Sequence, residues 1–282
     1  MKKVIISCDS TCDLPQEIIL QKNIRINPLP IMKDETVVRD GIDITTPEMF
    51  EYTKKTGKIL TTCAPNAAEM IDYFKSIYEE DAGIIHFTIS SELSCTCANA
   101  RIAATEFEDI HVIDTRSLST GLSLFAYKAC EMRDNGSTAQ EIADEMNRLA
   151  GSADTSFVLN TLDYMCKGGR CSSIAKLGAN LLKLKPCIEA VNGKLESGKK
   201  YRGAMAPVLM QYVEDRLINT EEIDTDRVFI THSYCEDELV SKVKEKVLSI
   251  VPFKEIIPTY AGCSISIHCG PGTLGILFFR KK

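Results

Sequence analysis

Continuous apolar runs alternate with helically spaced apolar residues through the first half of the chain. Continuous, β-branched runs of this length are typical of strands buried on both faces of a parallel sheet. Such runs predict strands at residues 4–8, 24–29, 83–89 and 110–114. Helical spacing predicts helices across residues 67–78 and 122–132, and Asp13-Leu14-Pro15 is expected to open another. This alternation predicts an α/β fold, a parallel sheet with helices on both faces.

The second half of the chain has a different rhythm. Asn192-Gly193 is a two-residue hairpin signal, and it lies between predicted strands at residues 187–191 and 194–196. Further strands are expected at residues 156–160, 228–231 and 274–279, with helices around 208–213 and 239–247. This pattern predicts an α+β domain with a mixed sheet. The 282 residues allow two cores, so we predict domains at residues 1–154 and 155–282.

Composition narrows the class of protein. Hydrophobic residues make up 44% of the chain and charged residues 26%, which is typical of a folded globular protein. The net charge of −6 comes without a long basic run, so the sequence predicts no nucleic-acid partner. No apolar run approaches the ~20 residues of a membrane span, and no signal-peptide pattern precedes the first strand. We therefore expect a cytoplasmic protein without integral membrane association.

Twelve cysteines accompany only four histidines. No Cys-x-x-Cys pair occurs, and Cys95 and Cys97 would project to different sides of a helix. A zinc or iron–sulfur site is therefore not expected, and the sequence predicts reduced, mostly buried thiols and no metal.

Candidate chemistry gathers where predicted strands end. The hydroxyl-rich segment at residues 90–97 joins the strand at 83–89 to a helix, where unpaired N–H groups and hydroxyls suit an anion. Ser94 acting as an ordinary helix N-cap is the alternative. Arg170, in a Gly-Gly-Arg turn, and His268, before Cys-Gly-Pro-Gly, are the basic candidates from the second half. Hydroxyls with these two residues would bind one carboxylate or phosphate. A solvated turn arginine and a core histidine are the alternatives.

Six motifs in order along the chain resemble the DegV family. They begin with Asp-Ser-Thr-Cys-Asp-Leu-Pro at residues 9–15 and Thr-Cys-Ala-Pro at 62–65. The hydroxyl-rich motif at 90–97 follows, then Asp-Thr-Arg-Ser-Leu-Ser-Thr-Gly at 114–121. The last two are Leu-Asp-Tyr-Met-Cys-Lys-Gly-Gly-Arg at 162–170 and His-Cys-Gly-Pro-Gly at 268–272. The resemblance covers essentially the whole chain.

This resemblance implies a long-chain fatty acid such as palmitate bound between two domains, with a separate fatty acid kinase as partner and no cofactor. Its implied ligand-binding residues are Thr61, Thr62, Ser94, Cys95, Thr96, Arg170 and His268. Ser94 and either Thr61 or Thr62 would bind the carboxylate, with the basic pair nearby. Candidate contacts for the acyl tail, which core packing would equally explain, are Ile26, Leu29, Ile31, Leu159 and Leu181.

The chain departs from the family pattern near this site. Cys95 replaces a glycine after Ser94, and Cys63-Ala64 replace Ser-Gln. Cys97 stands where the family has an aromatic residue. Gly203-Ala204-Met205 occupies positions where kinase-coupled members often carry basic residues, which weakens the expectation of kinase docking more than that of lipid binding.

Two other functions stay open at this stage. In an acyl hydrolase, Ser94 would be the nucleophile, His268 the base and Asp114 the orienting acid, although no Gly-x-Ser-x-Gly elbow is present. A sensor of a small phosphorylated ligand would use the same anion site. No P-loop is present, so ATP-dependent phosphorylation by this chain is not expected. The sequence favours a lipid carrier without chemistry of its own.

Overall fold

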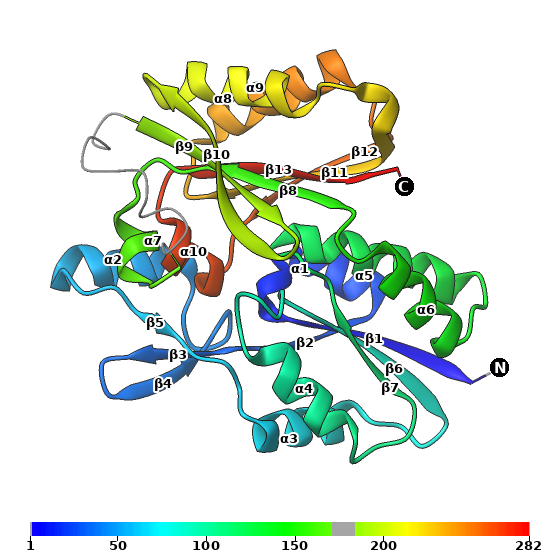
Figure 1. Cartoon of the computed structure of the whole chain (residues 1–282). Helices are drawn as coiled ribbons and strands as arrows, with labels where there is room; N and C mark the ends of the chain where they lie inside the picture. Colours follow the sequence, from blue (N-terminus) through cyan, green and yellow to red (C-terminus); the bar gives the residue numbers. More distant parts are fainter. Residues whose placement is uncertain (1, 171–183, 282) are drawn as a thin grey trace.

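The first sheet of the molecule has four parallel strands in the order β2-β1-β6-β7 (Figure 1). The computed structural model describes residues 2–170 and 184–281. Every residue of β6 is buried, as a continuous apolar run predicts. The predicted parallel sheet is confirmed. Its strands are β1 (Lys3–Asp9), β2 (Ile24–Asn27), β6 (Ala82–Thr88) and β7 (Ile110–Asp114).

Helices cover both faces of this sheet, as expected. Side chains alternate across β7, so Val112 packs with α3 (Ala67–Ile77) and α4 (Thr96–Ala104) on one face. Ile113 packs with α5 (Thr120–Asp134) and α6 (Ala139–Leu149) on the other. The short α1 (Gln16–Lys22) begins after Pro15, so the helix expected here does not include Asp13. Asp13 instead adopts a left-handed conformation with φ 53°.

The second sheet is mixed and has six strands, in the order β10-β9-β8-β13-β11-β12. Among the strands described in this sheet, only β11 and β12 pair in parallel. The predicted hairpin is confirmed, since Lys194 pairs with Val191 and the turn residues Asn192 and Gly193 both have positive φ. The strands are β8 (Ala153–Val158), β9 (Leu184–Val191), β10 (Lys194–Arg202), β11 (Ile223–Ser233), β12 (Glu255–Tyr260) and β13 (Thr273–Arg280).

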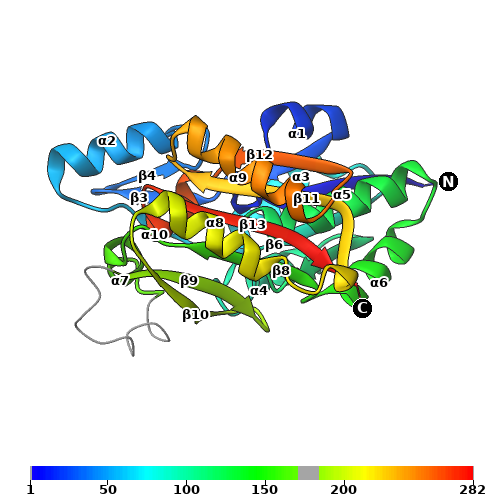
Figure 2. The same ribbon diagram turned by 90° about the horizontal axis from the view of Figure 1, so that it is seen from above.

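Helix α5 lies between the two sheets and gives them a common core. Phe125 of α5 belongs to one cluster with Ile6 of β1 and Leu277 of β13. On the far side of the six-stranded sheet lie α8 (Met205–Arg216) and α9 (Asp237–Ile250), which Figure 2 shows from above, lying over its strands. The order of layers is therefore helices, sheet, α5 and α6, sheet, helices.

A smaller structure closes one end of these layers. The strand expected at residues 24–29 stops at Asn27, because Pro28 and Pro30 lack the N–H groups that would extend the parallel pairing. The chain then forms a small antiparallel sheet, ordered β4-β3-β5. Its strands and the helices beside it are β3 (Pro30–Lys33), β4 (Thr36–Arg39), β5 (Thr61–Thr62), α2 (Thr46–Thr56), α7 (Asp163–Lys167) and α10 (Cys263–Cys269).

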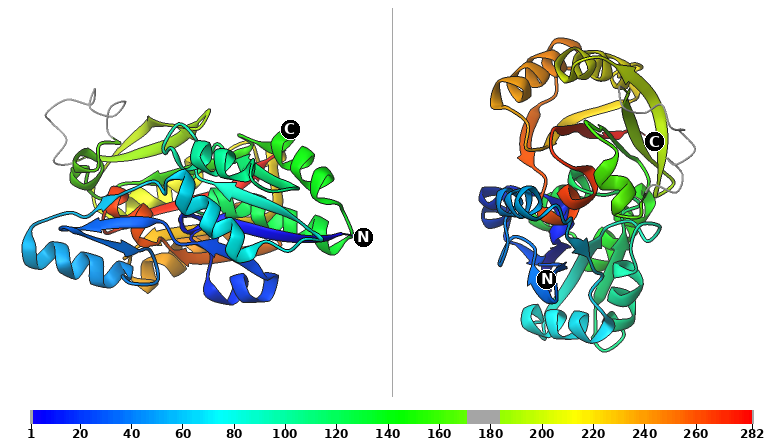
Figure 3. Two further views of the ribbon diagram at one scale, coloured as in Figure 1. Left: turned by 90° about the horizontal axis from the view of Figure 1, so that it is seen from below. Right: turned by 90° about the vertical axis from the view of Figure 1, so that its left-hand side faces the viewer.

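Helix α10 belongs to the C-terminal half of the sequence but packs against the N-terminal half. It contacts α2, β5 and the 3₁₀ turn at Ser10–Cys12, as well as α7. In the right-hand view of Figure 3 it lies between the N-terminal strands below and the C-terminal strands above. The strands up to residue 114 form the two smaller sheets and those from residue 153 the six-stranded one. A domain division after residue 154 stays a prediction, and it falls within β8.

Candidate functional site

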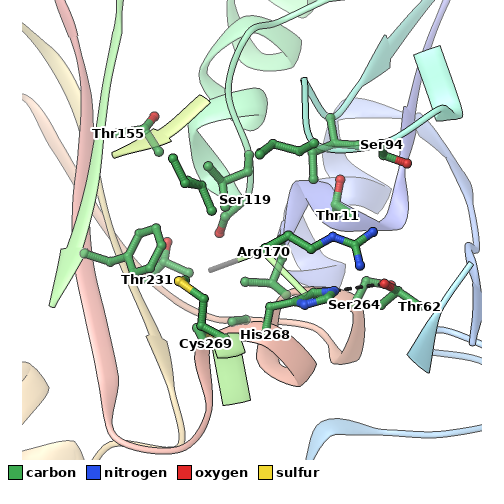
Figure 4. A pocket seen from close by; sticks show the side chains of 18 of the residues that line it. Thr11, Thr62, Ser94, Ser119, Thr155, Arg170, Thr231, Ser264, His268 and Cys269 are labelled. Atoms are coloured by element: carbon green, nitrogen blue, oxygen red, sulfur yellow. Dashed lines mark hydrogen bonds between the residues drawn. The ribbon is translucent and has the colours of Figure 1, made fainter. Parts of the chain in front are cut away.

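A cavity of about 410 Å³ lies where α10, β5 and the loop after β6 meet the six-stranded sheet. This volume is in the range of ~300–1,000 Å³ usual for small-molecule sites. Five of the seven predicted site residues line it: Thr62, Ser94, Cys95, Arg170 and His268. Figure 4 shows four of them around one end of the cavity, with Ser119 and Thr155 farther from that end.

Thr61 and Thr96 do not line the cavity. Neighbouring residues of a strand project to opposite faces, so pairing of β5 with β3 turns Thr62 inward and leaves Thr61 exposed. Thr96 is fully buried behind Ser94. Its hydroxyl lies 2.8 Å from Ser94 Oγ, and its backbone N–H donates to the same oxygen at 3.2 Å. Helix α4 begins at Thr96 with Cys95 preceding it, so Ser94 lies just before the helix.

Thr62 and His268 form the central contact of this end of the cavity. Thr62 Oγ1 lies 2.9 Å from His268 Nε2. His268 Nδ1 is buried and has no hydrogen-bond partner among the residues described. Burial, together with the nearby Arg170 guanidinium, lowers the pKa of His268 from 6.5 to about 4. The imidazole is therefore neutral at pH 7 and contributes no charge to the site.

The Gly-Gly-Arg turn brings Arg170 close to this histidine. A Cβ atom on Gly168 would lie 2.2 Å from His268 Nδ1, so only glycine allows this approach. Gly169 has a φ of 72°, which turns the chain after α7. Arg170 Nη1 then donates to the Gly168 carbonyl at 2.8 Å. Arg170 is the one lysine or arginine among the cavity residues that the structure describes.

Hydrogen bonds to Asp114 and to the β9–β10 hairpin help to hold the loop after β6. Ser91 Oγ donates to Asp114 Oδ2 at 2.5 Å, which links the ends of β6 and β7. Ser90 Oγ donates to the carbonyl of Gly193 at 2.8 Å, so the tip of the β9–β10 hairpin rests on this loop. A nearby ion pair joins Glu92 to Lys194. Asp114 thus positions the Ser90–Ser94 loop and does not contact His268.

Most hydroxyl groups in the cavity wall are already occupied by other protein groups. Ser119 donates to Asp13 at 2.5 Å, and Thr155 lies 2.7 Å from Ser117 Oγ. Thr231 and Thr273 are engaged with Thr120 and with the Cys269 carbonyl. The hydroxyl groups of these side chains are therefore engaged with protein, and mainly their carbon atoms face the cavity. The apolar lining residues are Leu29, Ile89, Leu93, Leu118, Phe157, Met165, Leu195, Ile265 and Leu277.

Of the tail contacts considered from the sequence, Leu29 lines the cavity. Leu159 does not line it but is buried in the same cluster as the lining residues Leu118 and Phe157. Ile31 is buried in a different cluster, and Ile26 packs against the shared core. Leu181 lies outside the described residues. No sequence pattern singles out the lining residues Leu93, Leu118 and Phe157, although each lies within a predicted strand or motif. The same is true of Ser264, which lies four residues before His268.

Two buried carboxylates hold α10 in place. Asp40 accepts from the backbone N–H groups of Cys263 at 3.0 Å and Ser264 at 3.2 Å. Asp13 accepts from Gly262 N at 2.8 Å. Burial raises the pKa of Asp13 well above its usual range, although the hydrogen bonds from Ser119 and Gly262 oppose this. The first motif of the chain therefore helps to anchor the helix that carries His268.

A third buried carboxylate, Asp9 at the end of β1, lies beside the cavity and holds part of its wall. Asp9 accepts from Ile89 N at 2.9 Å, and from the backbone and hydroxyl of Thr11. Burial raises its pKa from 3.8 to about 6, partly offset by these hydrogen bonds. Asp9 thus links the end of β1 to the loop that carries Ser94.

The fold and the cavity define an α/β protein with a parallel and a mixed sheet and a cavity lined from both halves of the chain. The chain belongs to the DegV family, because residues 3–281 match the family described as "Uncharacterised protein, DegV family". A DegV domain-containing protein of Clostridium perfringens is 30% identical over 291 residues, covering 99% of this chain and 98% of the relative.

Two further relatives have names that mention fatty acids. A "Fatty acid-binding protein" of Thermotoga maritima is 30% identical, covering 97% of this chain and 96% of its own length. A structure described as a stearic acid-binding protein of Eubacterium ventriosum is 26% identical, with a TM-score of 0.87. The alignment covers 100% of this chain and 99% of that one.

Among the described residues, no group of three or more histidine, cysteine, aspartate or glutamate side chains is placed to hold a metal ion. Among the same residues, no helix combines the length and apolar character needed to span a membrane. Most of the described cysteines are buried.

Proposed function

We propose that this protein binds a long-chain fatty acid in the cavity, with the carboxylate at the cluster formed by Thr62, Ser94 and Arg170. The observation that carries the proposal is this pairing of polar donors at one end with an apolar wall beyond them. The named functions of the relatives from Thermotoga and Eubacterium support the same ligand class.

The hydrogen-bond partners leave donors free for a carboxylate. If His268 carries its proton on Nε2, it donates to Thr62 Oγ1, and only a lone pair on Nδ1 is left without a partner. The other tautomer would bury an unpaired N–H, which is rarely tolerated. The Thr62 hydroxyl proton is then free to point at the ligand. The Ser94 hydroxyl proton is also free to point at the ligand, if Ser94 Oγ accepts the hydrogen bond from the Thr96 hydroxyl as well as that from the Thr96 backbone N–H. In this arrangement His268 is a positioning residue.

The ionised carboxylate would meet Arg170 and two hydroxyl donors, which together favour its charged form. The acyl chain would lie against Leu93, Leu118 and Phe157. Burial of each methylene contributes about 0.8 kcal/mol. Burial of a long chain therefore supplies the driving force, and the polar cluster fixes its direction.

The geometry gives less support to an acyl hydrolase. A Ser–His–Asp triad needs the base next to the nucleophile and an acid on its other nitrogen. Here the partner of Ser94 is Thr96, and that of His268 is Thr62. Asp114 accepts from Ser91 instead. We propose a carrier without catalytic chemistry of its own.

A sensor of a small phosphorylated ligand is also less favoured. A phosphate monoester carries nearly two charges at pH 7, and Arg170 is the one cationic lining residue described, with Glu92 also at the wall. A small phosphorylated ligand also has no long apolar group to pack against the apolar wall of the cavity.

We further propose that a separate kinase acts on the bound acid. Cys95 and Glu92 are exposed beside Ser94, so the carboxylate end of the cavity lies at the surface. A phosphate donor bound to another protein could therefore reach it. We keep the cytoplasm as the proposed location, since the many unbridged thiols suit a reducing compartment.

Mass spectrometry of an organic extract from the denatured protein tests the proposal. We expect one long-chain fatty acid per chain. Ser94→Ala should lower its retention by about 10- to 150-fold, because a hydrogen bond to a charged group contributes ~1.5–3 kcal/mol. Ser76→Ala, at an exposed serine of α3, is the control. An empty extract that stays empty after incubation with fatty acids would refute the proposed function.

A further inference from the structure

Ser264 is the unusual hydroxyl of the cavity. It lies four residues before His268 in α10, so both side chains share one face of that helix, and both line the cavity. Ser264 is only 4% exposed. Its Oγ is buried without a hydrogen-bond partner among the residues that the structure describes. Figure 4 shows it in the same close view as His268 and Thr62.

Neighbouring hydroxyls show that this fold usually satisfies such groups. Thr11 and Ser119 donate to Asp9 and Asp13, and Ser233 donates to Ser266 at 2.9 Å. A buried hydroxyl without a partner is costly, and an unsubstituted alkyl chain cannot supply one. The Ser264 hydroxyl, which is free to turn about one side-chain bond, therefore calls for a polar atom of the ligand.

The carboxylate of a fatty acid already has three donors in the proposed site, from Thr62, Ser94 and Arg170. Ser264 lies four residues from His268 toward the N-terminus of α10, a displacement of about 6 Å along the helix. That end of the helix is held by Asp13, whose other partner, Ser119, also lines the cavity. A ligand oxygen next to Ser264 would thus lie past the carboxylate, on the first few carbons of the chain.

We propose that Ser264 binds a hydroxyl or keto oxygen on the acyl chain near its carboxyl end, so that the preferred ligands are fatty acids oxygenated there. The inference rests on the proposed function and specifies its substrate class. A serine hydroxyl both donates and accepts, so it suits either oxygen. The backbone N–H of Ser264 is already bound by Asp40, which leaves the side chain as the recognition element.

Competition binding with defined acids tests this inference. The delipidated wild-type protein would be titrated with palmitate, 3-hydroxypalmitate and 10-hydroxypalmitate. We expect the 3-hydroxy acid to bind about five- to tenfold more tightly than palmitate, the range of one neutral hydrogen bond. The 10-hydroxy acid should bind more weakly than either, because its oxygen would meet the apolar wall.

Variants separate the possible roles of the side chain. Ser264→Ala should bind palmitate at least as well as the wild type and lose the preference for the 3-hydroxy acid, and Ser264→Thr should restore it. Equal binding of both acids by the wild type, or a preference that survives in Ser264→Ala, would overturn the inference. A loss of palmitate binding in Ser264→Ala as large as in Ser94→Ala would also overturn it, by making Ser264 a carboxylate ligand. If no acid binds the wild type, the proposed function itself fails.

Discussion

Replacing Thr62 with valine removes one hydroxyl from the centre of the site and changes little else. Valine has the shape of threonine and favours strands equally, so β5 should keep its pairing with β3. The substitution removes the hydroxyl proton proposed to reach the carboxylate. It also removes the oxygen 2.9 Å from His268 Nε2, which leaves both ring nitrogens unpartnered.

The expected loss of affinity combines these two effects. A hydrogen bond to a charged carboxylate contributes about 1.5–3 kcal/mol, which corresponds to about 10- to 150-fold in the dissociation constant. The second effect is the cost of leaving the His268 N–H without a partner. The variant bears this cost both with and without bound ligand, so most of it cancels in the dissociation constant. The assay is titration of delipidated protein with a fluorescent fatty acid, followed by competition with palmitate.

Thr61→Val is the matched control, because it makes the same chemical change one residue away on the opposite face of β5. Thr61 is exposed and does not line the cavity, so its variant should bind palmitate like the wild type. An equal loss in both variants would mean that the effect comes from β5 and not from the hydroxyl. No loss in Thr62→Val would remove Thr62 from the carboxylate site.

Three further predictions concern the support of the site and its response to pH. Asp40→Ala should destabilise the protein by about 3 kcal/mol in urea unfolding and weaken fatty acid retention, because the N–H groups at the start of α10 lose their acceptor; unchanged stability would contradict the anchoring role. Between pH 5.5 and 8 the pH profile of fatty acid affinity should be the same in the wild type and in His268→Gln, because the pKa of His268 is about 4, and a transition near pH 6.5 that His268→Gln abolishes would refute a neutral imidazole. Asp9 has a folded-state pKa raised from 3.8 to about 6, so its stabilising contribution is present below pH 4 and is lost as the pH rises through 6. Relative to Asp9→Asn, the wild type should therefore lose about 3 kcal/mol of unfolding free energy over that interval, and parallel pH profiles would contradict the raised pKa.

The strongest sequence patterns identified the elements that the structure confirms. The continuous apolar run of β6 and the positive φ angles that Asn192 and Gly193 adopt in the turn are strong local signals, so the sequence alone identified both. Helix α2 was not predicted, although Thr45, Pro47 and Glu48 form a capping box with proline in its first turn. Because few of its apolar residues are buried, the helical periodicity of its apolar positions is weak. The capping box is the sequence signal that predicts this helix.

The site was only partly predictable, because the face on which a strand's side chains lie depends on the register of its pairing with the neighbouring strand. Thr61 and Thr62 are chemically identical in the sequence, and only the pairing of β5 with β3 decides which one lines the cavity. The family resemblance implies Thr96 as a ligand-binding residue, but the structure buries it as a hydrogen-bond partner of Ser94. The neutral state of His268 depends on burial and on Arg170, which lies about a hundred residues earlier in the chain.

The shared core limits how a ligand can enter. A hinge motion that separated the two sheets would expose α5, whose Leu122 and Phe125 are fully buried. At ~25 cal/mol for each Å² of apolar surface, exposing such side chains costs several kcal/mol. The contacts described for the β9–β10 hairpin tip are weaker. They are hydrogen bonds from Ser90 and Arg116 to the carbonyls of Gly193 and Asn192, and an exposed ion pair between Glu92 and Lys194. Local displacement of this tip therefore costs less than opening the molecule, and it would uncover the loop that carries Ser94 while α10 stays held by its carboxylates.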